Sequence, residues 1–170
     1  MNRLFVTIVL CTLSLYGCKK ESTEPSTSIP KFAFYKLADS TITAHQAWTF
    51  HVDSVSLFPT PFLTENDLTS YNWSTHSFTA RSNIDTMFSQ LRWLGGKSSG
   101  VPFVVVANGS RIYIGAFWWA YSSSIPMGAY IDTYLASPYI IKRWESASLP
   151  DMRGDERIHS ALKSAGILIE

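Results

Sequence analysis

The stretch Gly100–Tyr121, GVPFVVVANGSRIYIGAFWWAY, decides the fold of this chain. Asn108-Gly109 supplies the positive φ angles that a type I′ turn requires, and apolar residues flank the turn on both sides. The pattern therefore predicts a β-hairpin over about 101–117. Both faces of this hairpin are apolar, which is typical of strands inside a sheet, so we expect other elements to cover each face.

The turn also predicts the register of the hairpin. With Ala107 opposite Ser110, the alternation of side chains along a strand assigns every residue to a face. One face is expected to carry Val101, Phe103, Val105, Ile112, Ile114 and Ala116. The other is expected to carry Val104, Val106, Tyr113, Phe117, Trp119 and Tyr121. Because neighbours on a strand face opposite sides, Trp118 is predicted to be buried and Trp119 accessible.

Two segments have the apolar spacing of amphipathic helices. In 82–94, Ser82 and Asp85 have the spacing of a capping box, and Gly95 stands where a left-handed C-terminal cap would lie. The apolar stripe of this helix is expected to cover one face of the hairpin and consists of Ile84, Met87, Phe88, Leu91 and Leu94. A second helix is expected over 155–165, with Gly166 ending it.

Shorter segments complete the expected sheet. The alternation at Trp48, Phe50 and Val52 predicts a strand whose phase slips at Asp53-Ser54. Further short strands are expected in 31–37, 75–79, 130–135 and 139–144, and a capped helical turn is expected in 64–68. The pattern as a whole predicts a single α+β domain over 31–170, with a mainly antiparallel sheet around the hairpin.

The N-terminus has the organisation of a secretory signal. Arg3 precedes the apolar run Leu4–Leu15, which is too short to span a bilayer, and Gly17 is a small residue before Cys18. Leu15-Tyr16-Gly17-Cys18 resembles the lipobox of bacterial lipoproteins, from which Tyr16 departs. The resemblance implies that residues 1–17 are a signal peptide and that acyl chains on Cys18 hold the protein in a membrane. The alternative is an ordinary secretory signal with an incidental cysteine.

The segment 18–30 is polar, contains two prolines and predicts a flexible tether. Lys19 is not the aspartate that favours inner-membrane retention in lipoproteins of the enteric type, so the resemblance implies an exported domain at the outer membrane. Removal of 1–17 takes away Arg3 and leaves 13 basic and 13 acidic side chains, so no charge excess attracts nucleic acid. Cys18 is the cysteine that remains, and lipid would occupy it.

A strand, a helix and a hairpin in this order resemble the small α+β head of the SecD export protein. In that family an Asp-Leu or Asp-Ile turn precedes the helix, and the hairpin leads into a Ser-rich loop with proline. The matching residues here are Asp67-Leu68, Val104–Gly109 and Ser123–Pro126. The resemblance covers roughly 60 residues. It implies a shared local fold and not export activity, because the sequence shows none of that family's membrane helices.

The sequence predicts no metal site and no cofactor. His51 and Asp53 would share one side of a strand, whereas a zinc site needs three or four converging ligands. A cluster of charged residues precedes the last helix and consists of Asp151, Arg153, Asp155, Glu156 and Arg157. It would suit an acid–base site, but local ion pairing and compensation of the helix dipole are the favoured explanation. No Gly-x-Ser-x-Gly elbow is present.

Four aromatic residues are the candidates for ligand binding: Tyr113, Phe117, Trp119 and Tyr121. Aromatic rings with a polar tip suit sugar rings or the side chains of a partner. The alternative is that other elements cover this row as a second core layer. We therefore expect a cell-envelope lipoprotein with a non-enzymatic domain that binds a glycan or an envelope protein. The alternatives are a structural or assembly component of the envelope and, third, a hydrolase built on the Asp151–Arg157 cluster.

Overall fold

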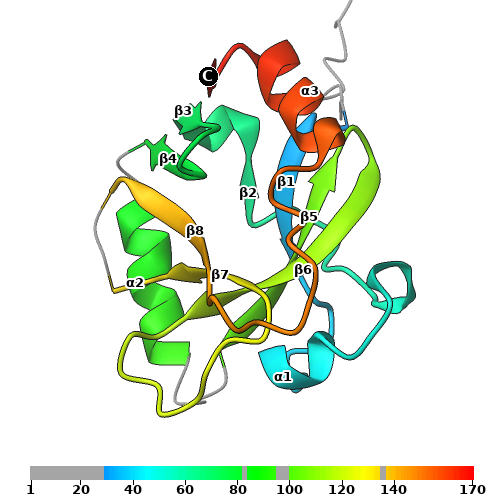
Figure 1. The fold of residues 1–170 in the computed structure, drawn as a ribbon, viewed down its shortest axis with the longest axis vertical. Helices are drawn as coiled ribbons and strands as arrows, with labels where there is room; N and C mark the ends of the chain where they lie inside the picture. Colours follow the sequence, from blue (N-terminus) through cyan, green and yellow to red (C-terminus); the bar gives the residue numbers. More distant parts are fainter. Residues whose placement is uncertain (1–28, 82–83, 95–99, 135–136) are drawn as a thin grey trace, which may run out of the picture.

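The computed structural model describes residues 29–81, 84–94, 100–134 and 137–170. Within these residues the fold is α+β, as the sequence predicts, with one curled sheet and three α-helices (Figure 1). The predicted signal peptide 1–17 and the tether residues 18–28 lie outside the described residues. None of the helices in the described ranges is long and apolar enough to cross a membrane.

The sheet extends well beyond the hairpin. Its strands are β1 (Phe32–Lys36), β2 (Leu63–Thr64), β3 (Leu68–Asn72), β4 (Ser77–Ala80), β5 (Val101–Ala107), β6 (Ser110–Trp118), β7 (Ala129–Asp132), β8 (Tyr139–Arg143) and β9 (Leu168–Ile169). The helices are α1 (Ala44–Ala47), α2 (Ile84–Leu94) and α3 (Glu156–Ala165), with 3-10 helices at Val52–Ser54 and Glu65–Asp67. The strand order is β2-β1-β5-β6-β7-β8-β4-β3-β9, so the predicted hairpin, β5 and β6, is interior. The β6–β7 and β3–β9 pairings are parallel, and the other pairings are antiparallel.

The hairpin turn forms as predicted, but the pairing of the two strands shifts by one residue a short distance beyond the turn. Asn108 and Gly109 have φ angles of 48° and 78°. Ala107 lies opposite Ser110, as predicted, and the register then shifts between Val105 and Val106. The expected pairings further along are wrong: Val105 lies opposite Tyr113, Phe103 opposite Gly115 and Val101 opposite Phe117. A β-bulge, which adds one residue to β6 at Ile112, moves every later residue of that strand by one position.

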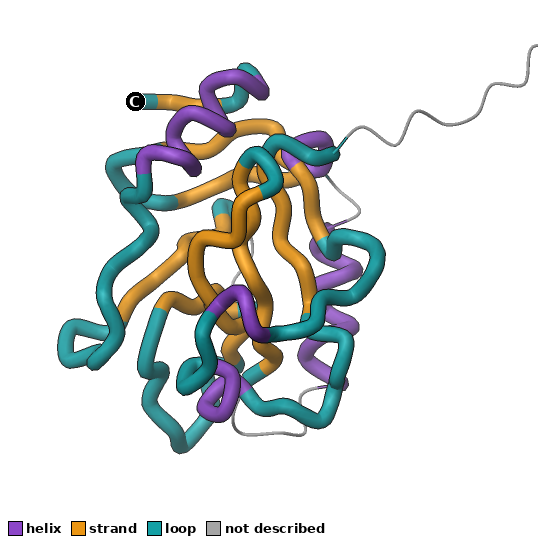
Figure 2. The backbone as a smooth tube through the Cα atoms, turned by 90° about the vertical axis from the view of Figure 1, so that its right-hand side faces the viewer, coloured by secondary structure: helices purple, strands orange, loops and turns teal. Residues whose placement is uncertain are grey.

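The sheet curls around the larger of two apolar cores. Phe34 in β1 and Phe78 in β4 have ring centroids 6.0 Å apart, although four strands separate β1 from β4 in the sheet order. Figure 2 shows α2 beside the strands and α3 at one end of the sheet. Phe88 of α2 packs edge-on against Phe117 of β6 at 5.5 Å, and Ile158 of α3 is also buried in this core. The two helices therefore cover the concave side of the sheet.

Both predicted helices are present. In α2 the stripe residues Ile84, Phe88 and Leu91 are buried, which confirms that this stripe covers the hairpin. The expected cap residues Ser82 and Gly95 lie outside the described residues, as does the side chain of Leu94. In α3, Asp155 is the N-cap and accepts a hydrogen bond from Arg157 N at 2.9 Å, and Gly166 is the C-cap with a φ angle of 74°.

The second core lies on the other face of the hairpin. Val104, Ile114 and Trp118 are buried there beneath α1 and Trp48. The predicted strand at 48–52 is wrong, because this segment leaves α1 and enters a 3-10 helix. Two interactions account for the difference. Thr43 forms a capping box with Gln46 at the start of α1, and Arg111 Nη1 in β6 donates to the carbonyl oxygens of residues 52, 53 and 55 at 3.2, 3.1 and 2.6 Å.

Candidate functional site

At the end of β6, one of two neighbouring tryptophans is buried in the core and the other is exposed to solvent. Trp118 is the last residue of β6 and is 4% exposed, with its ring stacked on Trp48 at 5.8 Å. Trp119 starts a turn in which Ser122 N donates to Trp119 O at 2.9 Å. Trp119 is 39% exposed and Tyr121 is 65% exposed. The prediction that Trp118 is the buried member of the pair is therefore confirmed.

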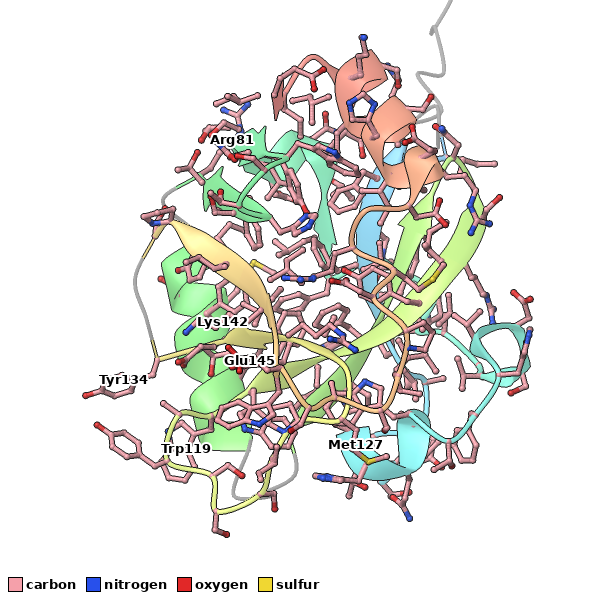
Figure 3. All side chains as sticks on the ribbon, in the orientation of Figure 1. Arg81, Trp119, Met127, Tyr134, Lys142 and Glu145 are labelled. Carbon is pink, nitrogen blue, oxygen red and sulfur yellow. The ribbon has the colours of Figure 1, made fainter. Side chains whose placement is uncertain are left out.

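A third ring, that of Tyr134, joins these two from the segment that follows β7 (Ala129–Asp132). Trp119 and Tyr121 have ring centroids 5.7 Å apart and planes at 74°, and Tyr121 meets Tyr134 at 5.2 Å and 81°. Tyr134 is 49% exposed. We call these three side chains the aromatic patch. Figure 3 shows Trp119 and Tyr134 at the same edge of the molecule, beside α2. A side-chain hydrogen bond with Tyr134 raises the pKa of Tyr121.

The parallel pairing of β6 and β7 brings the rings together. Trp118 lies opposite Asp132, so the two strands end side by side. Thr133 strengthens this end, because its backbone N donates to Trp118 O at 3.0 Å and its Oγ1 donates to the same oxygen at 3.2 Å. Tyr134 N donates to Asp132 Oδ1 at 3.0 Å, which fixes the first residues after β7. Strand pairing therefore determines the position of Tyr134 relative to Trp119.

The aromatic patch has a size that suits a small, rigid ligand. At roughly 150–250 Å² for each aromatic side chain, the exposed parts of the three rings amount to roughly 200–400 Å². A stable protein–protein interface buries about 800 Å² on each partner. Neighbouring rings stand edge to face, so they form an angled surface with two hydroxyl groups and one indole N–H. Such a surface can stack on an apolar ring face and hydrogen-bond to the groups around it.

A cavity of about 300 Å³ lies on the other side of the same turn. Its lining consists of Trp118, Ala120, Ser122, Ser123, Ser124, Ile125, Pro126, Tyr130, Asp132 and Trp144. Asp132 Oδ2 lies 3.7 Å from Lys142 Nζ, so this carboxylate is paired with a cation. Ser124 N donates to Ser122 Oγ at 3.1 Å and shapes the loop. We call this space the serine-loop cavity; its volume is at the lower end of the range of small-molecule sites.

Of the four aromatic residues predicted to bind a ligand, two are exposed and two are buried. Trp119 and Tyr121 are exposed, but Tyr113 and Phe117 are buried in the larger core. Phe117 packs on Phe103 with centroids 4.7 Å apart. The expectation that all four share one accessible side is wrong for two reasons. The bulge in β6 turns Tyr113 and Phe117 towards the concave side, and the strand ends before Trp119.

Sequence reasoning missed Tyr134 and Trp144. Tyr134 fell inside an expected strand over 130–135, whereas β7 ends at Asp132. Trp144 fell at the end of the expected strand over 139–144, whereas β8 ends at Arg143 and Trp144 borders the serine-loop cavity. No local motif marks either residue, because their position beside the turn at 119–122 depends on the pairing of distant strands.

The Asp151–Arg157 cluster resolves into two local ion pairs. Arg153 Nη2 donates to Asp151 Oδ2 at 2.7 Å, and Arg157 Nη2 donates to Asp155 Oδ2 at 2.7 Å. The hydrogen bond from Arg153 lowers the pKa of Asp151 to about 2, and Arg157 lowers the pKa of Asp155. Asp151 also borders a cavity of about 260 Å³ next to Trp48. An ionised carboxylate paired with a guanidinium has no proton to donate and little basicity at neutral pH.

The expected polar pair at His51 and Asp53 is exposed to solvent. His51 Nδ1 lies 3.7 Å from Asp53 Oδ2. Across the four described ranges, no group of three or more His, Cys, Asp or Glu side chains is placed to hold a metal ion.

Comparisons of the chain with protein-family models, with curated proteins and with solved structures found no match.

Proposed function

We propose that this protein is a cell-envelope lipoprotein, held at the outer membrane by acyl chains on Cys18, whose exported domain binds a glycan without transforming it. The lipobox-like Leu15-Tyr16-Gly17-Cys18 supports the anchor. One observation carries the binding function: three aromatic rings from the segments that follow β6 and β7 converge edge to face and remain between 39% and 65% exposed. Exposed rings in contact with one another are a feature of binding surfaces.

Size and charge favour a sugar over a protein partner. The patch offers less than half the area that one side of a stable protein interface buries. Asp132 and Lys142 lie beside the patch, and these two opposite charges pair with one another. A neutral sugar ring presents apolar C–H groups on its face and hydroxyl groups at its edge. The aromatic patch complements both, through its ring faces and its phenol and indole polar atoms.

The structural or assembly role is the second candidate, and the serine-loop cavity is the observation that favours it. Ile125 and Trp144 are exposed at its border. If a partner covered these residues together with the aromatic patch, the contact area would approach that of a protein interface. A hydrolase is the third candidate, and the low pKa of Asp151 counts against it, because that carboxylate is committed to Arg153.

The test measures retention of the lipidated protein, solubilised in detergent, on immobilised neutral polysaccharides and on an array of neutral oligosaccharides. Contacts between rings contribute about 0.5–1.5 kcal/mol each, so Trp119→Ala should weaken binding by about 2- to 12-fold. Tyr121→Ala should have a similar effect. Phe58→Ala is the matched control, because it also removes an exposed ring but lies outside the patch. The absence of glycan binding, or equal losses in Trp119→Ala and Phe58→Ala, would contradict the proposal.

A further inference from the structure

We infer that the aromatic patch faces away from the membrane that holds Cys18 and binds a neutral glycan polymer on the far side of the domain, not the sugar headgroups of that membrane. The inference rests on the proposed function and names the form and the place of its ligand. It follows from where the described chain begins, from the length of β6 and from the length of chain between Cys18 and Ile29.

The first described residues lie at the turn end of the hairpin. Lys31 O accepts a hydrogen bond from Asn108 N at 2.7 Å, which ties the start of the domain to the hairpin turn. Lys31 Nζ donates to Ser164 O near the end of α3 at 2.7 Å. Lys31 N donates to Glu65 Oε1 at 3.1 Å. Three elements thus fix the point at which the chain from Cys18 joins the domain.

The aromatic patch lies at the opposite end of the same strand. β6 begins at Ser110, beside the turn, and ends at Trp118, immediately before the patch. Nine residues of strand at about 3.3 Å each separate the two ends by roughly 25–30 Å. Figures 1 and 3 agree with this separation: β1 and α3 lie in the upper part of the view, and Trp119 lies at its lower edge. The anchor side and the patch are therefore at opposite poles of the domain.

The length of the connecting chain decides which pole meets the membrane. Ten residues lie between Cys18 and Ile29. A chain of this length spans at most about 35–40 Å when fully extended, and a coil of its length has an end-to-end distance of roughly 20 Å. Turning the patch onto the membrane would hold Ile29 roughly 25–30 Å above it, which stretches the connection beyond its coil distance of roughly 20 Å, to roughly three quarters of its full length. The short connection therefore favours orientations in which the patch points outward.

An open and electrically balanced patch suits the interior of a long chain of sugars. Its three rings are between 39% and 65% exposed, so a chain of sugars can lie across them. Asp132 and Lys142 offset each other's charge beside the patch, which favours a neutral sugar. A polymer also offers many equivalent rings to each patch, which raises the apparent affinity of membrane-bound copies.

The experiment uses the lipidated protein in vesicles and reports orientation and binding separately. Cys11 is removed with the signal peptide and Cys18 is acylated, so one introduced cysteine accepts one fluorescent label. Ser123→Cys places the label beside the patch, and Lys163→Cys places it beside Ser164 at the anchor pole, as the matched control. Brominated lipids should quench the label at 163 at least twice as strongly as the label at 123. Equal or reversed quenching would overturn the inferred orientation.

Binding is then compared between a soluble neutral polysaccharide and a neutral glycolipid placed in the same vesicles. We expect vesicle-bound protein to bind the polysaccharide within threefold of its affinity in detergent. If the affinity in vesicles falls more than tenfold, or if the glycolipid competes for the patch, the inference is wrong and glycan binding still stands. If the protein in detergent binds no polysaccharide, the proposed function is wrong and the inference falls with it.

Discussion

At the scale of single residues, the division between Trp118 and Trp119 arises from two different environments. Trp118 closes over β6 against Trp48, whose indole Nε1 donates to Ile114 O at 3.0 Å. Trp119 has left the strand, and its ring contacts Tyr121 in the solvent-exposed turn. Of these two adjacent tryptophans, Trp118 therefore packs in the core and Trp119 forms part of the exposed surface.

The buried ring of Phe103 should be among the most costly to remove. It has no exposed surface, it packs edge-on against Phe34 at 5.2 Å, and it lies over Gly115, where a Cβ would overlap the ring. Phe103→Ala should lower the free energy of unfolding by about 3–5 kcal/mol, because it leaves a cavity in the larger core. Urea unfolding measures the change. Phe58→Ala, which removes a half-exposed ring, is the control, and equal losses would contradict the central place of the hairpin.

The Asp151–Arg153 pair predicts a step in acid stability. The pKa of Asp151 falls from 3.8 to about 2 on folding, mainly through its hydrogen bond with Arg153. A carboxyl group whose pKa is lowered by folding stabilises the protein above its unfolded pKa, and this contribution disappears as the pH falls through the folded pKa. Wild-type stability should therefore decline between about pH 4 and pH 2.

Unfolding midpoints in urea, measured across this pH window, test the step. Asp151→Asn should be less stable than the wild type at pH 7, and the difference should shrink towards pH 2. Glu145→Gln, which neutralises an exposed carboxylate, is the control and should follow the wild type. A difference between Asp151→Asn and the wild type that does not change with pH would contradict the assigned role of the ion pair.

At the scale of elements, local signals account for the ends of α3 and for the hairpin turn. The bulge in β6 is the exception, since nothing in the ANGSRI sequence distinguishes Ile112 from its neighbours. Its effect is large, because a shift of one residue exchanges the two faces of the strand. Tyr113 thereby enters the larger core, where burial raises its pKa well above the ordinary value.

The end of α3 offers a clean test of a backbone requirement. Gly166 has a φ angle of 74°, and an added Cβ would meet no atom within 4 Å. Gly166→Ala should therefore cost about 1–2 kcal/mol through backbone strain alone. Gly154→Ala is the control, because a Cβ there also meets nothing and its φ angle is not in the left-handed region. Thermal unfolding should show a loss for the first variant and no loss for the second; equal effects would contradict this account.

At the scale of the whole molecule, one curled sheet separates the start of the described domain from the aromatic patch. Its anchor pole joins the start of the domain to the hairpin turn through Asn108 N and Lys31 O. Its other pole carries the aromatic patch, beyond the ends of β6 and β7. The rigid hairpin between them sets the distance, so the proposed orientation depends on the sheet and not on the loops.

Lipid attachment is the prediction that concerns the whole chain in its envelope. Cys18 should incorporate labelled palmitate in cells, because acyl chains with about 0.8 kcal/mol for each buried methylene group hold a protein firmly. Cys18→Ala should lose the label. Cys11→Ala is the matched control, since it removes the other cysteine and leaves the lipobox-like residues unchanged. Label that persists in Cys18→Ala, or that disappears in Cys11→Ala, would contradict the assigned anchor.

The sequence was enough to predict the hairpin turn, the burial of Trp118 beside an accessible Trp119, and the end of α3 at Gly166. These features depend on residues within a few positions of one another, so local dihedral preferences and side-chain periodicity are enough to predict them. Only the tertiary structure shows the bulge in β6, the course of the chain from Trp48 to Val55, and the position of Tyr134 at the patch. Each depends on contacts between segments far apart in the chain, such as the bonds from Arg111 to residues 52–55 and the parallel pairing of β6 with β7, and the free energy of such packing is not encoded in any one segment.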